Sequence, residues 1–481
     1  MKMPTFLLAA LAASSVFAVP TADFTQAGGK FRRALPSSGF GPMICSCPQE
    51  SIDAIKSMHF LNARTHDWAL LNSAERVCDY YHIFPLMHLD AKDPKNYHFG
   101  PTDYLLKRTR EETGLGIFYR LGTSIEHSGA KVHFNTLIPE DFDKVAETFA
   151  GTIRHYNKGW ANGFDWNIRY WEIWNEPEGV SNMWCPKEGN ADLTKEQDAT
   201  LRAECRAKFV KFFVTVLKRL KSEFPDVKVG GPALCWMNPA YFKELLKACR
   251  DAGVAPDFIS WHSYSNDPDA IMRAADDARK ICDSFGFTQC ELIINEWHYF
   301  GNYTWGELRS PNPEVQARVL DGPRSHNGIE AAAFTLATLA KFQTSKYDQA
   351  YYYGCRHHGS WGFKDYREQK YKTYYALKMF GGLAKNYPVI SPVSGTAKGD
   401  PTVFAVRSED GRKAALLVVD YKGKSRTLTV NVKGVAGKKV VAKVLDHERN
   451  LESCAADLQG ETLKLEKADD NSAAFLVTFE L

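Results

Sequence analysis

The strongest constraint on the fold is a repeated alternation between short apolar runs and segments with helical spacing of apolar residues. In residues 140–156, for example, one helical face collects Phe142, Val145, Ala146, Phe149 and Ile153. Eight such pairs of strand and helix fit between residues 41 and 386. Eight βα units in succession predict a (β/α)8 barrel, also called a TIM barrel, which is an α/β fold.

The expected elements follow one another in strict order. Strands are expected at 42–45, 61–67, 116–122, 168–177, 227–235, 257–264, 290–298 and 349–355. Helices are expected at 49–59, 102–112, 140–156, 201–221, 239–250, 269–285, 328–344 and 371–383.

The N-terminal residues 1–18 have the pattern of a secretory signal peptide. Lys2 precedes an apolar run from Phe6 to Phe17, and Ala18 with Val16 offers a cleavage site. The run is too short to span a bilayer, and no cysteine follows it to carry a lipid. We therefore expect a secreted or periplasmic protein without a membrane helix.

The C-terminal residues 387–481 change character to short segments that alternate or run apolar between Gly, Asp and Lys turns. This pattern predicts a β-sandwich domain that follows the barrel of residues 41–386. Residues 19–40 form a leader with two interpretations. The leader could supply a strand of the β-sandwich, or it could be a linker behind the signal peptide.

The charge balance gives no reason to expect a nucleic-acid or anionic-membrane partner. The chain carries 60 basic and 57 acidic residues, for a net charge of +3. Eleven cysteines leave at least one free if the others pair. In an oxidising compartment, local bridges could join Cys282 with Cys290 and Cys185 with Cys205.

Two of the expected strands end on the same dipeptide, Asn-Glu. Residues 168–177 stop at Asn175-Glu176-Pro177, and residues 290–298 contain Asn295-Glu296. The C-terminal ends of barrel strands carry catalytic groups, and a pair of carboxylates is what glycoside hydrolysis requires. For either glutamate alone, a solvated loop residue or a helix cap is the simpler interpretation. Two in matching contexts favour catalysis.

Three long connections follow expected strands, at 68–101, 178–200 and 298–327, whereas the connections entering strands are short. Long loops on the catalytic face should wall the site into a blind pocket, which favours exo-action on a glycan end. The loops carry apolar anchors, although they could instead be mobile or form an oligomer contact. These anchors are Pro94, Tyr97, Phe99, Met183, Trp184, Tyr299, Tyr303 and Trp305.

The motifs resemble those of the clan A retaining (β/α)8 glycoside hydrolases. Residues 171–177, Trp-Glu-Ile-Trp-Asn-Glu-Pro, resemble the acid/base motif on strand four of the clan, and 293–297 resembles the strand with the nucleophile. Residues 63–67 and 258–264 point most closely to glycoside hydrolase family 39, the β-xylosidase/α-L-iduronidase family, whose barrel precedes a β-sandwich. The resemblance implies double displacement with Glu176 as acid/base and Glu296 as nucleophile.

Further residues acquire roles from the resemblance. Asn175 would bind the sugar 2-hydroxyl, although it could simply cap a turn, and Arg64 would keep Glu296 ionised, although it could be a structural ion pair. His262 and Tyr264 alternate along one strand and so face the same side. Tyr264 would support the nucleophile. The expected substrate-binding set is completed by His66, Asp67, His262, Tyr264 and Trp361, the last as a stacking ring or as ordinary packing.

Other functions stay open on the same fold. An exported carbohydrate-binding protein with a dead barrel, or an endo-acting glycanase, would have the same layout. A lyase or isomerase would normally need a metal cluster or a strand-end lysine. Neither Cys45/Cys47 nor His357/His358 has a second pair at ligand spacing, so no metal and no cofactor are expected. The expected partner is an oligo- or polysaccharide.

Overall fold

A computed structural model describes residues 19–35, 37–38, 48–68, 76–124, 138–178, 184 and 193–481 of the chain. The expected signal peptide, the expected strand at 42–45, and Met183 and Cys185 lie outside these residues. Among the described helices, none combines the length and the apolar character that a membrane span requires.

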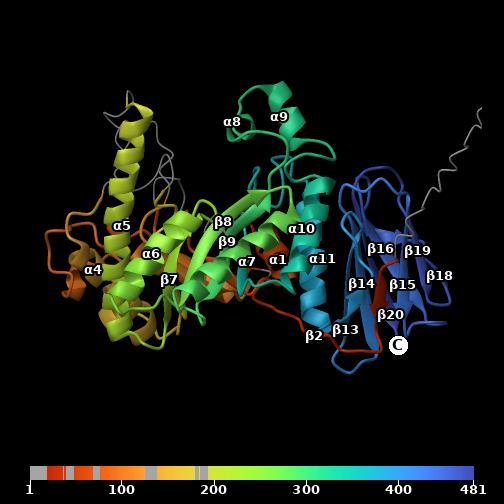
Figure 1. The fold of residues 1–481 in the computed structure, drawn as a ribbon, viewed down its shortest axis with the longest axis horizontal. Coiled ribbons are helices and arrows are strands. Elements are labelled where there is room, and N and C mark those ends of the chain that lie inside the picture. Colours follow the sequence, from red (N-terminus) through yellow and green to blue (C-terminus); the bar gives the residue numbers. More distant parts are fainter. Residues whose placement is uncertain are drawn as a thin grey trace, which may run out of the picture.

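The centre of the protein is a closed barrel of eight parallel strands (Figure 1). In barrel order the strands are β10 (Gln349–Tyr352), β3 (Ser37–Ser38), β4 (Asn62–Arg64), β5 (Gly116–Leu121), β6 (Tyr170–Ile173), β7 (Lys228–Leu234), β8 (Phe258–Ser265) and β9 (Glu291–Tyr299). The predicted (β/α)8 fold is confirmed. The first described strand of the barrel, β3, lies at Ser37–Ser38 within the expected leader, and the expected start at residue 41 lies outside the described residues. Two serines carry no apolar pattern, and only their pairing with Tyr351 and Ala63 defines this strand.

The barrel helices lie close to their predicted positions. They are α1 (Gln49–Ser57), α3 (Gly100–Arg108), α4 (Phe142–Lys158), α5 (Lys195–Glu223), α6 (Pro239–Asp251), α7 (Pro268–Ser284), α10 (Ile329–Phe342) and α11 (Lys372–Asn386). Helix α5 begins six residues before the expected start, because Thr194 and Gln197 form a reciprocal capping box there. Its N-terminal end therefore projects beyond the barrel (Figure 1).

Short helices occupy two of the long connections. They are α2 (Tyr80–Ile83), η2 (Pro94–Asn96), α8 (Trp305–Leu308) and α9 (Pro313–Leu320). Two more follow barrel helices directly: η3 (Thr109–Thr113) continues α3, and η5 (Trp160–Asn162) comes after α4. Helices α8 and α9 follow β9 and rise from the same face of the barrel as the projecting end of α5 (Figure 1).

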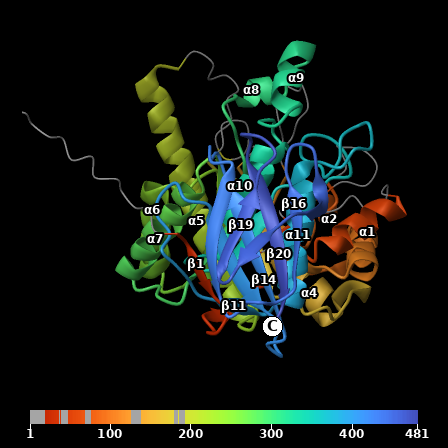
Figure 2. The same cartoon turned by 90° about the vertical axis from the view of Figure 1, so that its right-hand side faces the viewer.

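Two antiparallel-rich sheets form the C-terminal sandwich, which faces the viewer in Figure 2. One sheet has the order β12-β1-β15-β19-β18 and the other β17-β16-β20-β14-β13-β11-β2. The strands are β1 (Thr21–Asp23), β2 (Gly29–Lys30), β11 (Val389–Ser391), β12 (Val393–Ser394), β13 (Thr402–Arg407), β14 (Lys413–Asp420), β15 (Thr427–Lys433), β16 (Val440–Leu445), β17 (Asn450–Cys454), β18 (Asp457–Gln459), β19 (Thr462–Glu466) and β20 (Ala473–Glu480). The leader supplies one strand to each sheet, since β1 pairs with β15 and β2 with β11.

Strand β14, in the middle of the seven-stranded sheet, is buried on both faces, which explains its continuous apolar run. Leu416 and Val418 point into the sandwich core, whereas Leu417 and Val419 belong to the core shared with the barrel. Helices α10 and α11 lie between this sheet and the barrel strands (Figures 1 and 2). A strand covered on both sides loses the polar alternation of a half-exposed one.

The expected bridge between Cys282 and Cys290 is absent, because both thiols are free and buried. The other expected pair, Cys185 with Cys205, includes a residue outside the described part of the chain, so that bridge stays a prediction.

Candidate active site

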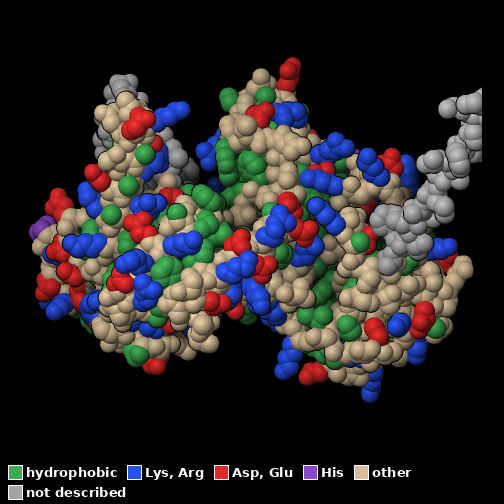
Figure 3. All heavy atoms as spheres, viewed as in Figure 1, with side chains coloured by type: hydrophobic (Ala, Val, Ile, Leu, Met, Phe, Trp, Pro, Cys, Tyr) green, Lys and Arg blue, Asp and Glu red, His purple; other side chains and the backbone are tan. Residues whose placement is uncertain are grey.

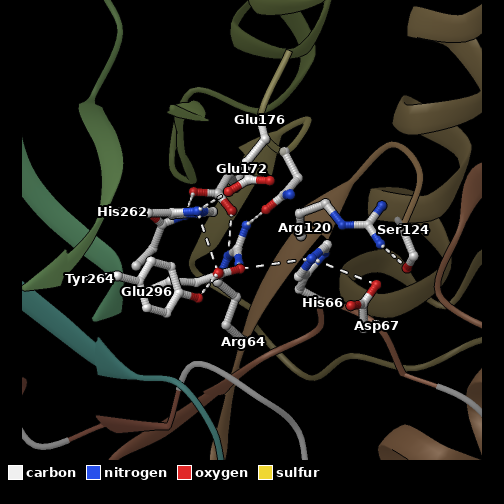
Figure 4. A network of polar contacts seen from close by, with 12 residues as sticks. Arg64, His66, Asp67, Arg120, Ser124, Glu172, Glu176, His262, Tyr264 and Glu296 are labelled. Carbon is white, nitrogen blue, oxygen red and sulfur yellow. Dashed lines mark hydrogen bonds and ion pairs between the residues drawn. The ribbon is translucent and has the colours of Figure 1, made fainter. Parts of the chain in front are cut away.

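A network of charged and polar side chains closes the C-terminal end of the barrel interior (Figure 4). Below it, an apolar layer of Phe118, Phe258, Ile293 and Tyr351 fills the barrel. The side chains of the network come from four strands: Arg64 from β4, Glu172 from β6, His262 and Tyr264 from β8, and Glu296 from β9. Asn175 and Glu176 follow directly after β6.

A β-bulge aims Glu296 into this network. Strands β8 and β9 pair in regular register up to Trp261 and Ile294, and then His262 pairs with Glu296, which leaves one extra residue, Asn295, on β9. Bulges re-aim side chains and are frequent beside active sites. Asn295 also points inward, since its amide donates to Glu172 over 2.6 Å.

The two glutamates lie at the separation that retaining glycosidases use. One carboxylate oxygen of Glu176, one of Glu296 and a ring nitrogen of His262 all lie within 4.8 Å of one another. Carboxyl groups are about 5–5.5 Å apart in retaining enzymes and about 6.5–9.5 Å apart in inverting ones. The spacing leaves no room for a water molecule behind the sugar, so it suits direct attack by a carboxylate.

Arg64 is fully buried and binds three partners in the network. Its Nε donates to Glu172 over 2.6 Å, Nη1 to Glu296 over 2.9 Å and Nη2 to Asn175 Oδ1 over 2.6 Å. A guanidinium fork has the planar geometry that such multiple bonds require. Arg64 therefore holds Glu172, Asn175 and Glu296 in one fixed arrangement.

Glu172 is the network residue that sequence reasoning missed. It lies at the centre of β6, fully buried, and binds Arg64, Ser260 and Asn295. The available signal was a charged residue inside an otherwise apolar strand. Buried carboxylates need such partners, and Glu172 shares the single positive charge of Arg64 with Glu296.

Glu296 is buried, with 4% of its surface exposed. The bulge draws it inward, where Tyr264 donates to its Oε2 over 2.6 Å and Arg64 to its Oε1. Burial raises the pKa of Glu296, and the charge of Arg64 and the Tyr264 hydroxyl counteract that rise. Because hydrogen-bond donors reach both of its oxygens, Glu296 is the glutamate of the pair whose ionised form is favoured.

Glu176 lies in a different environment, with its side chain 16% exposed. Burial raises the pKa of Glu176 to about 7, although a hydrogen bond from the Cys235 thiol and the charge of Arg64 lower it. The backbone of Glu176 is left-handed, with φ of 47°, as is that of Trp174 with φ of 75°. Such conformations in non-glycine residues carry strain and gather at functional sites.

His262 bridges the two carboxylates. Its Nδ1 lies 2.7 Å from Glu176 Oε1 and 3.4 Å from Glu296 Oε2. Burial lowers the pKa of His262 to about 4, so the ring is neutral near pH 7. Depending on its tautomer, a neutral ring can accept a hydrogen bond from the protonated Glu176 carboxyl group or donate one to the ionised carboxylate, which suits a carboxyl group that changes protonation during a reaction.

Asn175 carries an unused donor. Its Oδ1 accepts from Arg64, which fixes the orientation of the amide, and its buried Nδ2 has no hydrogen-bond partner among the described residues. An unsatisfied buried donor is costly unless a ligand completes it. The expected contact with a sugar hydroxyl fits this free amide group.

His66 and Asp67 stand beside Glu296 at the end of β4. His66 Nε2 lies 3.7 Å from Glu296 Oε1 and 3.6 Å from Asp67 Oδ1. Burial, together with Arg64 and Arg120, lowers the pKa of His66 well below its usual value. The histidine is therefore a neutral hydrogen-bonding group at neutral pH.

Trp361 packs in an aromatic wall on the nucleophile side. Its ring lies 5.7 Å from that of Tyr264 in an edge arrangement and stacks on Trp305 of α8 at 5.9 Å. Trp305 is 41% exposed. The first long loop is anchored as expected, since Phe99 stacks on His155 of α4 at 3.6 Å and Tyr97 packs edge-on against Trp160 of η5 at 5.0 Å. In the second loop, Trp184 is buried among α4 and α5 residues.

Two groups of described residues have metal-ligand geometry. One is Glu176, His262 and Glu296, and the other is His357, His358 and Glu368. In the second group Glu368 is already paired with the buried Lys364, whose charge would oppose a cation. The first group coincides with the carboxylate pair, where Arg64 supplies the positive charge.

No protein-family model matches the sequence. A β-xylosidase from Geobacillus stearothermophilus is 27% identical over 134 residues, which are 27% of this chain and 22% of that protein. A β-xylosidase from Caldicellulosiruptor saccharolyticus is 28% identical over 173 residues, 34% of this chain and 30% of that protein. The chain thus matches less than a third of the length of these relatives.

The likeness of structure extends much further than that of sequence. The crystal structure of a glucosidase from Croceicoccus marinus matches with a TM-score of 0.71, covering 97% of this chain and all of that one at 18% identity. The resemblance to the (β/α)8 glycoside hydrolases is confirmed, while the assignment to family 39 stays a prediction. The chain has the fold of these barrel-and-sandwich glycosidases.

Proposed function

We propose that the protein is a retaining O-glycoside hydrolase that acts by double displacement, with Glu176 as acid/base and Glu296 as nucleophile. The observation that carries the proposal is the pair of carboxylates within 4.8 Å, held in unlike environments. The pKa of Glu176 is about 7, so this group keeps a proton that it can donate near neutral pH. Glu296 receives hydrogen bonds from Arg64 and Tyr264, which favour its ionised form.

The first step forms a glycosyl ester. Glu296 attacks the anomeric carbon while Glu176 gives its proton to the glycosidic oxygen, so the leaving group departs as an alcohol. In the second step ionised Glu176 takes a proton from water, the water oxygen attacks the same carbon, and Glu296 leaves as a carboxylate. Two inversions restore the original anomeric configuration.

Asn175 and His262 support both steps. The free Nδ2 of Asn175 would bind the sugar 2-hydroxyl, a contact that strengthens at the transition state. His262 touches Glu176 at 2.7 Å and can hold the carboxyl group in place in either protonation state.

The substrate that the relatives favour is a xyloside, because both curated relatives are named β-xylosidases. We propose exo-action, releasing one sugar or a short unit from a non-reducing end. The aromatic wall of Tyr264, Trp361 and Trp305 on one side of the site supports a closed end. A ladder of intermediate oligosaccharides early in the digestion of a xylan would instead indicate endo-action.

Export is part of the proposal and rests on residues 1–18. Mass spectrometry of the mature protein should find its first residue at Val19. An intact N-terminus on protein recovered from the expressing cells would contradict it.

Two experiments test the chemistry. Nitrophenyl glycosides should identify the sugar, and NMR of the first product should show retained configuration. A 2-deoxy-2-fluoro glycoside of that sugar should then label Glu296 covalently, which peptide mass spectrometry can locate. An inverted first product, or a label on another residue, would refute the assignment.

A matched control comes from the same strand. Glu291 lies at the N-terminal end of β9 and pairs with Lys228 and Tyr170. Glu291→Gln should keep turnover, whereas Glu296→Gln should lose it. Equal turnover in these two variants would show that Glu296 is not the nucleophile, whereas a wild type without turnover on any glycoside would indicate a binding protein.

A further inference from the structure

A cavity of about 380 Å³ lies between α5 and α6, outside the carboxylate network. Its size is within the range of small-molecule sites, about 300–1,000 Å³. Three parts of the chain line it: the segment after β6, the N-terminal half of α5 and the turn from β7 to α6. The residues that matter are Glu178, Arg202, Arg206, Trp236, Asn238 and Tyr241.

Hydrogen bonds link the chain segments that line the cavity to the segment that carries Glu176. Glu176 donates its amide to Ala233 over 2.9 Å, and Glu178 accepts from the Cys235 amide over 2.7 Å. The Cys235 thiol in turn hydrogen-bonds the Glu176 carboxyl. Glu178 and Trp236 therefore extend the two chain segments that hold Glu176.

The position of the cavity relative to Glu176 and Glu296 decides which part of a substrate reaches it. Glu296 comes from β9, and β8 separates that strand from β7. In the proposed reaction Glu176 faces the glycosidic oxygen, so the leaving group extends on its side. Figure 3 shows the molecule hollowed between the projecting end of α5 and the α8–α9 segment, with hydrophobic side chains along the recess.

The lining presents polar groups without partners. Glu178 Oε2 and the Tyr241 hydroxyl are buried, and neither has a hydrogen-bond partner among the described residues. Burial raises the pKa of Glu178 to about 8, so near neutral pH its carboxyl group can donate as well as accept. Two orphaned polar groups in one cavity indicate a ligand with hydroxyl groups.

The remaining lining residues fit a neutral sugar better than an ion. Trp236 is 55% exposed and offers a flat apolar surface with a polar edge. Arg202 pairs with Asp198 at 2.8 Å and Arg206 with Glu244 at 2.7 Å, so both guanidinium charges are compensated. The cavity therefore offers a ring for stacking and groups for hydrogen bonds, and it has no net charge that a ligand would have to neutralise.

We propose that this cavity binds the sugar unit on the leaving-group side of the scissile bond. Trp236 stacks on the face of that sugar, and Glu178 and Tyr241 bind its hydroxyl groups. The proposal rests on the proposed glycosidase function and adds to it a recognition site for an oligosaccharide leaving group.

The test compares two substrates that share the cleaved sugar. β-1,4-Xylobiose has a sugar as leaving group, and 4-nitrophenyl β-D-xylopyranoside has none; the matching pair is used if the glycoside panel identifies another sugar. Trp236→Ala and Glu178→Gln should each lower kcat/KM for the disaccharide by roughly tenfold or more, with a factor of ten equal to about 1.4 kcal/mol. The value for the nitrophenyl glycoside should change by less than about twofold.

Tyr104→Ala is the matched control, because Tyr104 is an exposed ring on α3, away from both sites. It should change neither substrate. Equal losses on both substrates, or no loss on the disaccharide, would overturn the proposal.

A binding measurement separates this proposal from the proposed function. Xylobiose is titrated by calorimetry into Glu296→Gln protein with and without Trp236→Ala. The second substitution should raise Kd at least roughly tenfold, whatever the turnover of the wild type. Unchanged affinity would overturn the cavity assignment, whereas a wild type that cleaves no glycoside would overturn only the catalytic function.

Discussion

Replacing Glu176 by glutamine should separate catalysis from stability at one position. Glutamine keeps the shape of a protonated glutamate but cannot give up a proton. General acid catalysis contributes roughly 10²–10⁴-fold, so kcat/KM for a disaccharide should fall by that factor. A dinitrophenyl glycoside needs little protonation of its leaving group, and its first step should be much less affected.

The same substitution should stabilise the fold above neutral pH. The pKa of Glu176 is raised from 4.5 to about 7 by burial, so the folded state binds more protons than the unfolded state between these values. The wild type therefore loses stability as pH rises through that window. A shift of this size corresponds to about 3 kcal/mol at 1.36 kcal/mol per pKa unit, and the glutamine variant avoids that loss.

Urea unfolding of both proteins at pH 4 and pH 8 measures the difference. We expect equal free energies of unfolding at pH 4 and a variant more stable by up to about 3 kcal/mol at pH 8. A difference in stability that does not depend on pH would refute the assigned environment of Glu176. Disaccharide turnover above a tenth of the wild-type rate would refute its role as acid.

Three further substitutions test the network around the carboxylates. Arg64→Met leaves Glu172 and Glu296 buried without their cation, so the free energy of unfolding should fall by about 3–5 kcal/mol, against less than about 1 kcal/mol for Arg273→Met at the exposed pair with Asp267. Similar losses for the two variants in urea titrations would contradict this. Asn175→Ala should lower kcat/KM for a normal glycoside far more than for its 2-deoxy analogue. Equal losses on the two substrates would show that Asn175 does not bind the 2-hydroxyl. Tyr264→Phe removes a donor to Glu296, so the acidic limb of the kcat/KM profile should move to higher pH, and an unmoved limb would show that the hydroxyl does not stabilise the carboxylate.

The barrel could be predicted from the sequence because most of its strands carry their own signal. β8 and β9 are long apolar runs with polar ends, and hydrophobic alternation along the chain is enough to place them. β3 has no such signal. Its two serines become a strand only because β10 and β4 lie on either side of them.

The site could be predicted in part for a similar reason. The Asn-Glu pairs at the ends of β6 and β9 are local features of the sequence. The partner of Glu172 is Arg64, from another strand, and no local pattern joins them. The bulge that turns Glu296 inward depends on the register between β8 and β9, which is also a property of two segments together.

The leader strands have a consequence for how the chain can fold. β1 and β2, near the N-terminus, complete sheets whose other strands lie near the C-terminus, and Thr21 pairs with Asn431. During synthesis these strands must wait until nearly the whole chain has emerged, while the barrel between them can form first. Truncation before residue 387 would leave both leader strands without partners. The two domains should therefore resist separate expression and unfold together.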